Sequence, residues 1–407
     1  MRILFLTQWF DPEPTPKGMT FIKELSNRGH QIEVLTGIPN YPLGKFYDGY
    51  KFKIYNQEFI DGIRIIRVPL YPSHNNSAFK RMITYLTFSI SAIFFGLFTT
   101  KKADIIYAYH PPNVGFIASV LSFFKRIPFV HDIQDLWPES FSSTGIINNS
   151  YLIKLINILC NFVYMRASIL VVISEGFKSR LIERGVKEEK IRVIYNWCDE
   201  SKILSNYNFD SSPRFNESLD SSSFNILFAG NMGKAQNLHL VLDAAKILQD
   251  KKSSVQYIFI GSGTELEFLQ NRSIEEGIKN VIFLPRQPME KIGAFLRAAD
   301  ILLVILKDDP LFKVTIPSKI QTYMAIGKPI LISAAGEPAE IVRKSKSGLV
   351  VLPNNSKLLA ETSNDFAEMS KKELMRLGRN GKEYYFSKFS LTVGITKLDL
   401  IFKEILE

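Results

Sequence analysis

Short apolar runs typical of buried β-strands alternate with longer stretches typical of helices, and this alternation occurs in two successive series along the chain. In the first series we expect strands at residues 3–6, 32–35, 63–68, 105–108, 128–131 and 169–172, with helices at 19–28, 82–100, 114–125, 151–166 and 176–184. In the second series we expect strands at 225–229, 255–260, 281–284, 301–306, 329–333 and 349–352, with helices at 238–249, 265–276, 289–298, 318–326, 338–344 and from 371 onward. Strands separated by helices favour right-handed crossovers and parallel sheets. The sequence therefore predicts an α/β chain with two doubly wound, Rossmann-like parallel-sheet domains and an interdomain cleft at their facing strand ends.

The two series are separated by a segment, residues 200–223, whose composition differs from both. It is rich in Ser, Asn and Asp and shows no periodicity, which is typical of a linker. A chain of 407 residues is also too long for one ordinary hydrophobic core. We therefore expect an N-terminal domain over 1–200, a linker over 201–223 and a C-terminal domain over 224–384.

Composition excludes several kinds of site. The chain has only two cysteines, Cys160 and Cys198, which excludes a disulfide framework, a Cys-based zinc site and an iron–sulfur cluster and suits a reducing compartment. No spacing of His, Asp and Glu matches a zinc helix or an EF-hand loop, so we expect no metal site. The formal net charge of +10 would attract anionic lipid or nucleotide phosphate. Nucleic-acid binding is not expected, because the basic residues are dispersed.

Apolar segments in the first half bear on location and membrane contact. The run at 3–6 is too short for a secretory signal peptide, so we expect a cytoplasmic protein. Residues 82–100 carry no charge, have basic pairs at both ends and would span about 28 Å as a helix. A buried helix of a globular domain is the favoured interpretation; a helix partly inserted in the cytoplasmic leaflet and a true span stay open. Because 114–126 and 151–166 are also apolar helices ending in basic residues, the sequence predicts a membrane-facing N-terminal domain.

A glycine-containing turn follows the first strand of the second series. The strand ends at Gly230, the loop holds Asn231, Gly233 and Lys234, and a helix follows. Glycines let the backbone approach a ligand, and a helix N-terminus offers free N–H groups. The turn does not match a Walker sequence or the dinucleotide fingerprint. It could hold a diphosphate, and a tight turn without ligand explains it equally well.

The next two strands end in similar ways. Gly261 and Gly263 form another glycine turn at a helix start, either for a ligand or as a simple tight connection. Arg286 and Gln287 follow the strand at 281–284, where they could contact the edge of a base or belong to a polar loop.

The segment "VTIPSKIQTYMAIGKPIL" is the most specific of the second half. Ser318 stands where an N-cap residue belongs, Lys319 and Gln321 lie in the first helical turn, and Gly327 is placed to end the helix. Together with Lys234, this gives two helix starts that each have a lysine beside them. Such a pair suits the diphosphate of a sugar nucleotide.

Polar side chains also follow an apolar strand of the first half. His131, Asp132 and Asp135 lie in "HDIQDLWPES". A lone histidine at such a place is more often a hydrogen-bonded structural residue, and nothing nearby resembles a nucleophile elbow.

Several long segments carry a resemblance to a known family. They are, in chain order, "GHQIEVLTGIPNYPLGKFYDGYKFK", "DGIRIIRVP", "HDIQDLWPES", "VVISEGFKSRLIERGV", "IRVIYNWCD" and "PSKIQTYMAIGKPIL". On these segments the chain resembles the retaining glycosyltransferases of family 4, which have the GT-B architecture. Within them it is most similar to the bacterial subgroup that adds amino sugars such as N-acetyl-L-fucosamine during O-antigen or capsule assembly.

The resemblance implies where the substrates bind. The C-terminal domain would hold a UDP-sugar donor, with the base near Arg286 and Gln287. The implied donor-binding residues are Gly230, Asn231, Gly233, Lys234, Gly261, Gly263, Arg286, Gln287, Pro317, Ser318, Lys319 and Gln321. The N-terminal domain would bind a polyprenyl-diphosphate-linked saccharide through the loop after its first strand and its apolar helices. His131, Asp132 and Asp135 match the family's cleft segment, and with Lys319 they are the implied catalytic residues.

The sequence also departs from the broader family. Two glutamates that much of family 4 carries are replaced by Val314 and Thr322, while Gln321 is typical of the narrower subgroup. The family's Arg and Lys at the diphosphate turn fall on Asn231 and Gln236, which leaves Lys234 to carry the charge there. The first loop reads "TPKGM" where a double glycine is usual.

The implied reaction is sugar transfer with retention of anomeric configuration, without a metal or a cofactor. Lys234, Lys319 and helix N-termini would stabilise the leaving diphosphate. The enzyme would work at the cytoplasmic leaflet of the inner membrane. The resemblance also implies that residues from about 385 to 407 pack on the N-terminal domain. Two alternatives stay open: a UDP-N-acetylhexosamine 2-epimerase, which needs no acceptor, and a non-catalytic membrane-associated assembly factor. A homo-oligomer is compatible with each.

Overall fold

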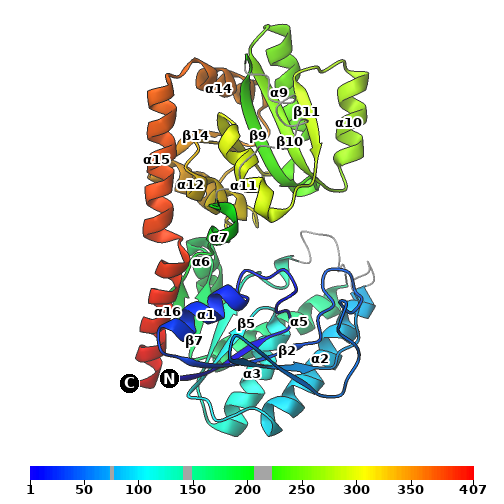
Figure 1. Ribbon diagram of the computed structural model, residues 1–407, viewed down its shortest axis with the longest axis vertical. Coiled ribbons are helices and arrows are strands. Elements are labelled where there is room, and N and C mark those ends of the chain that lie inside the picture. The colour runs from blue at the N-terminus through cyan, green and yellow to red at the C-terminus, as the bar shows by residue number, and fades with distance from the viewer. Residues whose placement is uncertain (74–77, 141–148, 206–221) are drawn as a thin grey trace. The chain divides into compact units, whose positions relative to one another are not determined.

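The computed structural model describes residues 1–73, 78–140, 149–205 and 222–407. The chain divides into two compact units (Figure 1). The N-terminal unit contains Met1–Tyr195 and Gly394–Glu407, and the C-terminal unit contains Asn196–Val393. Most of the expected linker lies outside the described residues, and its first part forms the short helix α7 (Glu200–Ile203) of the C-terminal unit.

The N-terminal unit is built on an eight-stranded sheet with strand order β3-β4-β2-β1-β5-β6-β7-β8. The strands are β1 (Arg2–Thr7), β2 (Gln31–Gly37), β3 (Asn56–Ile60), β4 (Ile63–Val68), β5 (Ile105–Tyr109), β6 (Phe129–Ile133), β7 (Ile169–Val172) and β8 (Ile191–Val193). The helices are α1 (Met19–Asn27), α2 (Ala78–Phe98), α3 (Pro112–Lys125), α5 (Ser150–Arg166), α6 (Glu175–Glu183) and α16 (Leu391–Leu406), with a 3₁₀ turn η1 (Glu188–Lys190). Strands β5, β6 and β7 are buried along their whole length, as expected for parallel strands covered on both faces.

Strand β3 is the one antiparallel member of this sheet and was not predicted. Its residues alternate between partly buried and exposed, so it lacks the continuous apolar run of the central strands. It pairs with β4 across a turn at Asp61 and Gly62, whose φ angles are 50° and 79°. An Asp-Gly pair with two positive φ values is a hairpin signal, and it was available in the sequence.

The C-terminal unit contains a six-stranded, fully parallel sheet with strand order β11-β10-β9-β12-β13-β14. Its strands are β9 (Phe224–Asn231), β10 (Val255–Ser262), β11 (Val281–Pro285), β12 (Ile301–Ile305), β13 (Ile330–Ser333) and β14 (Gly348–Val351). Its other elements are η2 (Lys234–Gln236), α9 (His239–Asp250), α10 (Leu266–Glu275), α11 (Met289–Ala298), α12 (Ser318–Ile326), α13 (Glu337–Ser345), α14 (Ser356–Glu368) and α15 (Lys371–Lys388). The prediction of two parallel-sheet, Rossmann-like units is therefore confirmed.

The last helix, α16, belongs to the N-terminal unit from Gly394 onward. Asp399 on α16 accepts hydrogen bonds from Arg28 Nη1 at 2.8 Å and lies 2.8 Å from His30 Nε2. Phe402 is fully buried and meets the Tyr107 ring edge-on, with the ring centroids 5.9 Å apart. The chain therefore returns to the N-terminal unit at residue 394, nine residues later than the expected 385.

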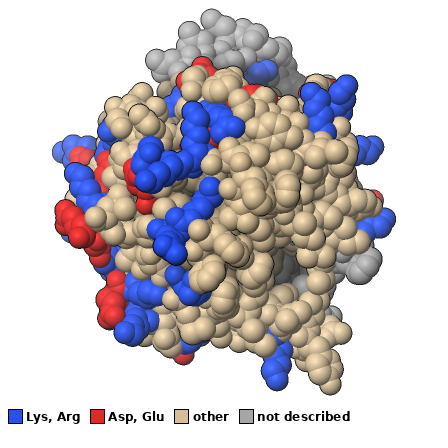
Figure 2. Space-filling model, turned by 90° about the horizontal axis from the view of Figure 1, so that it is seen from below, with Lys and Arg blue, Asp and Glu red and all other residues tan. Residues whose placement is uncertain are grey.

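Helices α2, α3 and α5 cover one side of the N-terminal sheet, with α3 packed against both of the others. Seen from below Figure 1, where α2 and α3 are drawn, the molecule shows a broad area without charged side chains (Figure 2). Lys and Arg gather along one side of this area, and most of the Asp and Glu visible in this view lie beyond them, toward the margin (Figure 2).

Candidate functional site

A cavity of about 530 Å³ opens at the carboxyl ends of β9, β10 and β11 in the C-terminal unit. This end of a parallel sheet is where doubly wound folds bind ligands. The lining residues are Ile203, Ala229, Gly230, Asn231, Ile260, Gly261, Ser262, Arg286, Gln287, Pro288, Met289, Ile292, Leu296, Ser318, Lys319, Thr322 and Tyr323. Two of these side chains are cationic and none is a carboxylate, so the cavity suits an anionic ligand.

Glycines form the floor of the cavity. Gly230 and Gly261 are paired neighbours on β9 and β10, with φ angles of 139° and 153°. A methyl group on Gly261 would lie 1.9 Å from the carbonyl oxygen of Gly230, and one on Gly230 would lie 2.9 Å from Cε of Lys319. Gly261 therefore leaves no room for a side chain, a side chain on Gly230 would displace the end of Lys319, and the backbone itself borders the cavity.

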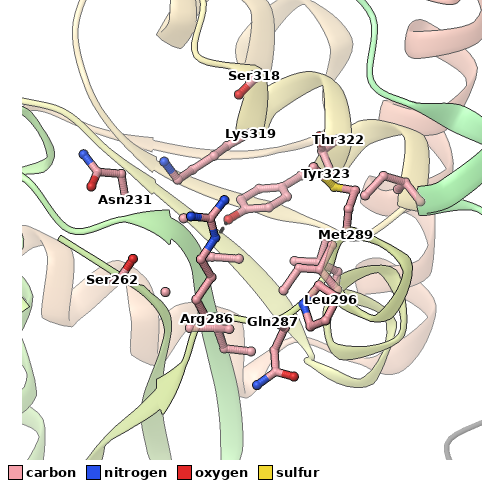
Figure 3. A pocket seen from close by; sticks show the side chains of 17 residues that line it. Asn231, Ser262, Arg286, Gln287, Met289, Leu296, Ser318, Lys319, Thr322 and Tyr323 are labelled. Carbon is pink, nitrogen blue, oxygen red and sulfur yellow. Dashed lines mark hydrogen bonds between the residues drawn. The ribbon is translucent and has the colours of Figure 1, made fainter. Parts of the chain in front are cut away.

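Lys319 enters the cavity from the first turn of α12 (Figure 3). Its Nζ lies 3.3 Å from Oε1 of Gln236 and 4.7 Å from the centre of the Phe228 ring. No carboxylate of a described residue lies within 4.0 Å of it. Burial lowers the pKa of Lys319 to about 8. A partly buried ammonium group without an acidic neighbour is stabilised by binding an anion.

The start of α12 is open to a ligand. Ser318 was predicted as the N-cap, but it is the first helical residue, and the N-cap is Pro317, which makes no side-chain cap hydrogen bond. Helix α14 also begins with Ser-Lys, but there the N-cap Asn355 accepts a hydrogen bond from the backbone N–H of Leu358 at 2.9 Å. The N–H groups at the start of α12 have no such side-chain cap and can donate to an anion.

The remaining walls differ in character. Arg286 and Gln287 follow β11 directly, and the Arg286 guanidinium points into the cavity on the side facing Lys319 (Figure 3). Met289 and Leu296 on α11 form an apolar wall with Thr322 beside it (Figure 3). The cavity thus has a cationic part and an apolar part, as a ligand with a diphosphate and a flat base requires.

Seven of the predicted donor-binding residues line this cavity: Gly230, Asn231, Gly261, Arg286, Gln287, Ser318 and Lys319. Five others, Gly233, Lys234, Gly263, Pro317 and Gln321, are not among its lining residues. Gln321 is 2% exposed, and its amide lies 2.8 Å from the carbonyl oxygen of Pro317, so it supports the helix start from behind.

Sequence reasoning named Thr322 only as the place of a glutamate that the broader family carries, and it missed Tyr323. Tyr323 is buried, and its hydroxyl accepts a hydrogen bond from the backbone N–H of Ala229 at 3.0 Å, which fixes the end of β9. Both residues stand three and four positions after Lys319, on the same face of α12. Helical spacing from Lys319 was the signal that could have found them.

In the N-terminal unit, the three residues predicted to be catalytic have different surroundings. Asp132 is fully buried and accepts hydrogen bonds from Lys17 Nζ and the Tyr107 hydroxyl. His131 is 1% exposed, its Nδ1 lies 3.2 Å from the carbonyl oxygen of Ala108, and burial lowers its pKa to about 4. Asp135 is exposed and lies 3.2 Å from Nε2 of His110. Of these three residues, His131 and Asp132 are buried against protein groups, and only Asp135 is exposed to solvent.

Sequence reasoning also missed Glu13, which joins two loops at the carboxyl edge of this sheet. Its carboxylate accepts backbone N–H bonds from Asn40 and Tyr41, both at 2.7 Å, and from Phe10 at 3.0 Å. Burial raises the pKa of Glu13 to about 7. Trp9 packs against Tyr41 with the ring centroids 5.0 Å apart. The hydrogen bonds to Glu13 therefore also hold these two aromatic rings together.

Two family models match the chain. The model "Glycosyl transferase 4-like domain" matches residues 19–197, and the model "Glycosyl transferases group 1" matches residues 211–384. The two matches together span most of the chain and correspond to its two sheets. The chain therefore belongs to the group 1 glycosyltransferases.

Similar proteins support this assignment. The chain is 26% identical to "Putative colanic acid biosynthesis glycosyl transferase WcaI" of Escherichia coli K12, over 82% of this chain and 83% of that protein. Sucrose-phosphate synthase from Thermosynechococcus elongatus superposes with a TM-score of 0.73 at 16% identity, covering 99% of this chain and 98% of its own. Anabaena Alr3699/HepE in complex with UDP and glucose gives a TM-score of 0.68 at 18% identity, covering 99% of this chain and 100% of its own. These solved structures confirm the GT-B fold.

Proposed function

We propose that this glycosyltransferase moves a sugar from a UDP-sugar to a polyprenyl-diphosphate-linked saccharide with retention of anomeric configuration. The observation that carries the donor assignment is Lys319, a partly buried cation with no acidic neighbour among the described residues, beside the uncapped start of α12. Arg286 adds a second positive charge across the cavity. The structure of HepE with UDP supports a nucleotide-sugar donor for this fold.

The proposed mechanism uses charges that are in place before the reaction. The bond between the anomeric carbon and the diphosphate breaks, and the acceptor hydroxyl bonds to that carbon on the face the diphosphate leaves. The hydroxyl proton passes to the departing diphosphate, so no protein nucleophile is needed. Lys319 and the first N–H groups of α12 stabilise the negative charge that develops on the diphosphate. No metal or cofactor takes part in the proposed reaction.

The proposed biological setting is the assembly of an O-antigen or capsular polysaccharide. The printed name of WcaI refers to colanic acid biosynthesis, which is consistent with an extracellular polysaccharide. On the family resemblance, the proposed donor sugar is an N-acetylated amino deoxy sugar such as L-FucNAc. The enzyme would act in the cytoplasm, peripherally on the inner membrane that carries its acceptor.

An assay with and without acceptor tests the proposal. The purified protein is incubated with UDP-N-acetyl-L-fucosamine and lipid-linked saccharide from cells that lack this protein. The proposal predicts acceptor-dependent release of UDP and an anomeric configuration by NMR equal to that of the donor. Conversion of the donor alone to an epimer would identify an epimerase, inversion would refute the mechanism, and failure to bind any UDP-sugar would support an assembly factor.

Donor affinity should depend on pH through Lys319. The charged ammonium binds the diphosphate, and its pKa in the free protein is about 8. Affinity should therefore be constant well below pH 8 and fall as pH rises above 8, approaching about tenfold per pH unit. Titration calorimetry with a UDP-sugar between about pH 6.5 and 9.5 measures this decline. Lys319→Met should bind weakly at every pH without the decline, and a pH-independent wild-type affinity would contradict the assignment.

A methyl group on Gly230 should weaken donor binding without unfolding the unit. It would lie 2.9 Å from Cε and 3.0 Å from Nζ of Lys319, so Gly230→Ala displaces the ammonium group as well as straining a φ of 139°. We expect UDP affinity to fall about tenfold or more. Gly277→Ala is the matched control, because Gly277 also has positive φ, 64°, but has nothing within 4 Å. Equal UDP affinity in the two variants would show that the floor of this cavity does not contact the donor.

A further inference from the structure

The outer sides of α2, α3 and α5 expose a set of large apolar side chains. Their exposed fractions run from 39% for Phe162 to 85% for Tyr151. We call this set the apolar face; its members are Met82, Leu86, Ile90, Phe94, Phe98, Phe123, Phe124, Tyr151, Leu155, Ile158, Phe162 and Met165. Soluble proteins rarely expose so many apolar side chains on adjacent elements unless a partner covers them.

The three helices present these side chains on one continuous surface. The rings of Phe116 on α3 and Phe162 on α5 lie 6.2 Å apart, and the guanidinium of Arg166 lies 5.8 Å over the ring of Phe123. Helices α2 and α3 approach closely at Gly96, where a methyl group would lie 2.8 Å from Cδ1 of Leu121. The uncharged area of Figure 2 is on this side of the unit.

The opposite sides of the same helices are packed into the domain. On α2, Phe88 and Ala92 are fully buried, and on α5 so is Val163. Among the described residues, one helical segment, Lys80–Phe98, has the length and composition to cross a membrane, and 33% of its most apolar window is buried. Crossing a bilayer would remove Phe88 and Ala92 from the core. Helix α2 therefore has the form of an interfacial helix that lies in the membrane plane.

The charges of these helices indicate which surface they meet. Helices α2, α3 and α5 contain no Asp or Glu. Basic residues stand at or near their ends: Lys80, Arg81, Lys101, Lys102, Lys125, Arg126, Lys154 and Arg166. A basic surface opposes a second copy of itself and attracts anionic headgroups, while the apolar side chains enter the boundary with the acyl chains.

We propose that the apolar face docks the N-terminal unit flat on an anionic phospholipid membrane. This deepens the proposed function, because it places the enzyme on the surface that carries its lipid-linked acceptor. Docking itself needs neither donor nor transfer, so it can be tested separately.

The test is co-sedimentation with vesicles of phosphatidylcholine alone or mixed with phosphatidylglycerol. The wild-type protein should sediment with the anionic vesicles, and added salt should weaken this binding. Leu86→Glu and Phe124→Glu change side chains that are 61% and 65% exposed, so folding should be preserved. Each should reduce partitioning about tenfold or more. The matched control is Ile274→Glu, since Ile274 is 79% exposed on α10 of the C-terminal unit and should leave vesicle binding unchanged.

Three outcomes would overturn the proposal. Vesicle binding at the wild-type level in both Leu86→Glu and Phe124→Glu would exclude this face as the membrane contact. Membrane-bound protein that resists extraction with alkaline carbonate would indicate a transmembrane α2. A dimer that Leu86→Glu converts to a monomer, with vesicle binding unchanged, would make the face an interface between copies. UDP affinity is measured on the same variants. A variant that loses vesicle binding but binds UDP normally has an intact donor site, so the docking proposal and the proposed function can fail independently.

Discussion

Lys319→Ala is expected to lower kcat/KM for the UDP-sugar about 100-fold to 1,000-fold, as removal of a preorganised charge from a transition-state site does elsewhere. No carboxylate is among the described residues that line its cavity, so its charge is available to the diphosphate. Because the charge on the diphosphate grows as the glycosidic bond breaks, kcat should fall as well as affinity. Steady-state kinetics with the lipid-linked acceptor in excess separates the two effects.

The chain offers a closely matched control for this variant. Lys357 is also the second residue of a helix and also follows a serine, but it lies on α14, whose N-cap Asn355 caps the helix start. Lys357→Ala should leave kcat/KM within about twofold of wild type. Lys234→Ala should cost less than Lys319→Ala, since Lys234 is exposed and does not line the cavity. Wild-type kinetics for Lys319→Ala would remove the basis of the donor assignment.

Asp132→Asn is expected to destabilise the N-terminal unit by about 3–5 kcal/mol, because it leaves the charge of Lys17 buried without its counter-ion. The side chains of Lys17 and Asp132 are 1% and 0% exposed, and Asp132 also accepts a hydrogen bond from the Tyr107 hydroxyl. Urea unfolding followed by tryptophan fluorescence measures the loss, since Trp9 and Trp137 both lie in this unit.

The double variant Lys17→Met/Asp132→Asn separates ion pairing from other effects. Removing both charges should restore part of the stability that Asp132→Asn loses, because no unpaired charge then remains buried. UDP affinity should be unchanged in both variants, as the proposed donor cavity lies in the C-terminal unit. Asp132→Asn as stable as wild type would contradict a structural ion pair. So would a double variant whose loss of unfolding free energy equals the sum of the losses in Lys17→Met and Asp132→Asn.

Most of the fold could be predicted because parallel strands are buried on both faces and therefore appear in the sequence as short apolar runs. Strand β3 was missed because two of its five side chains are exposed and the other three are only partly buried, which leaves no such run. The helix over 318–326 was predicted with its observed bounds, since Pro317 and Gly327 mark its two ends. Its N-cap was assigned to Ser318 because serine is a frequent cap, although Pro317 holds that position.

The proposed donor cavity could be predicted in outline because several of its residues lie at the carboxyl end of a strand. Gly230 and Gly261 lie at the ends of β9 and β10, Arg286 directly follows β11, and parallel strands bring these ends to one edge of the sheet. The surroundings of Asp132 could not be predicted in the same way. Lys17 reaches it from 115 residues away in the chain, and nothing in the local sequence around Asp132 indicates that partner.

The most direct test of the donor site is a crystal structure of the protein with bound UDP. We predict that the nucleotide occupies the cavity at the ends of β9, β10 and β11, with a diphosphate oxygen within about 3.2 Å of Lys319 Nζ. The diphosphate should also accept hydrogen bonds from backbone N–H groups at the start of α12. UDP bound elsewhere, or bound while Lys319 points into solvent, would contradict the account.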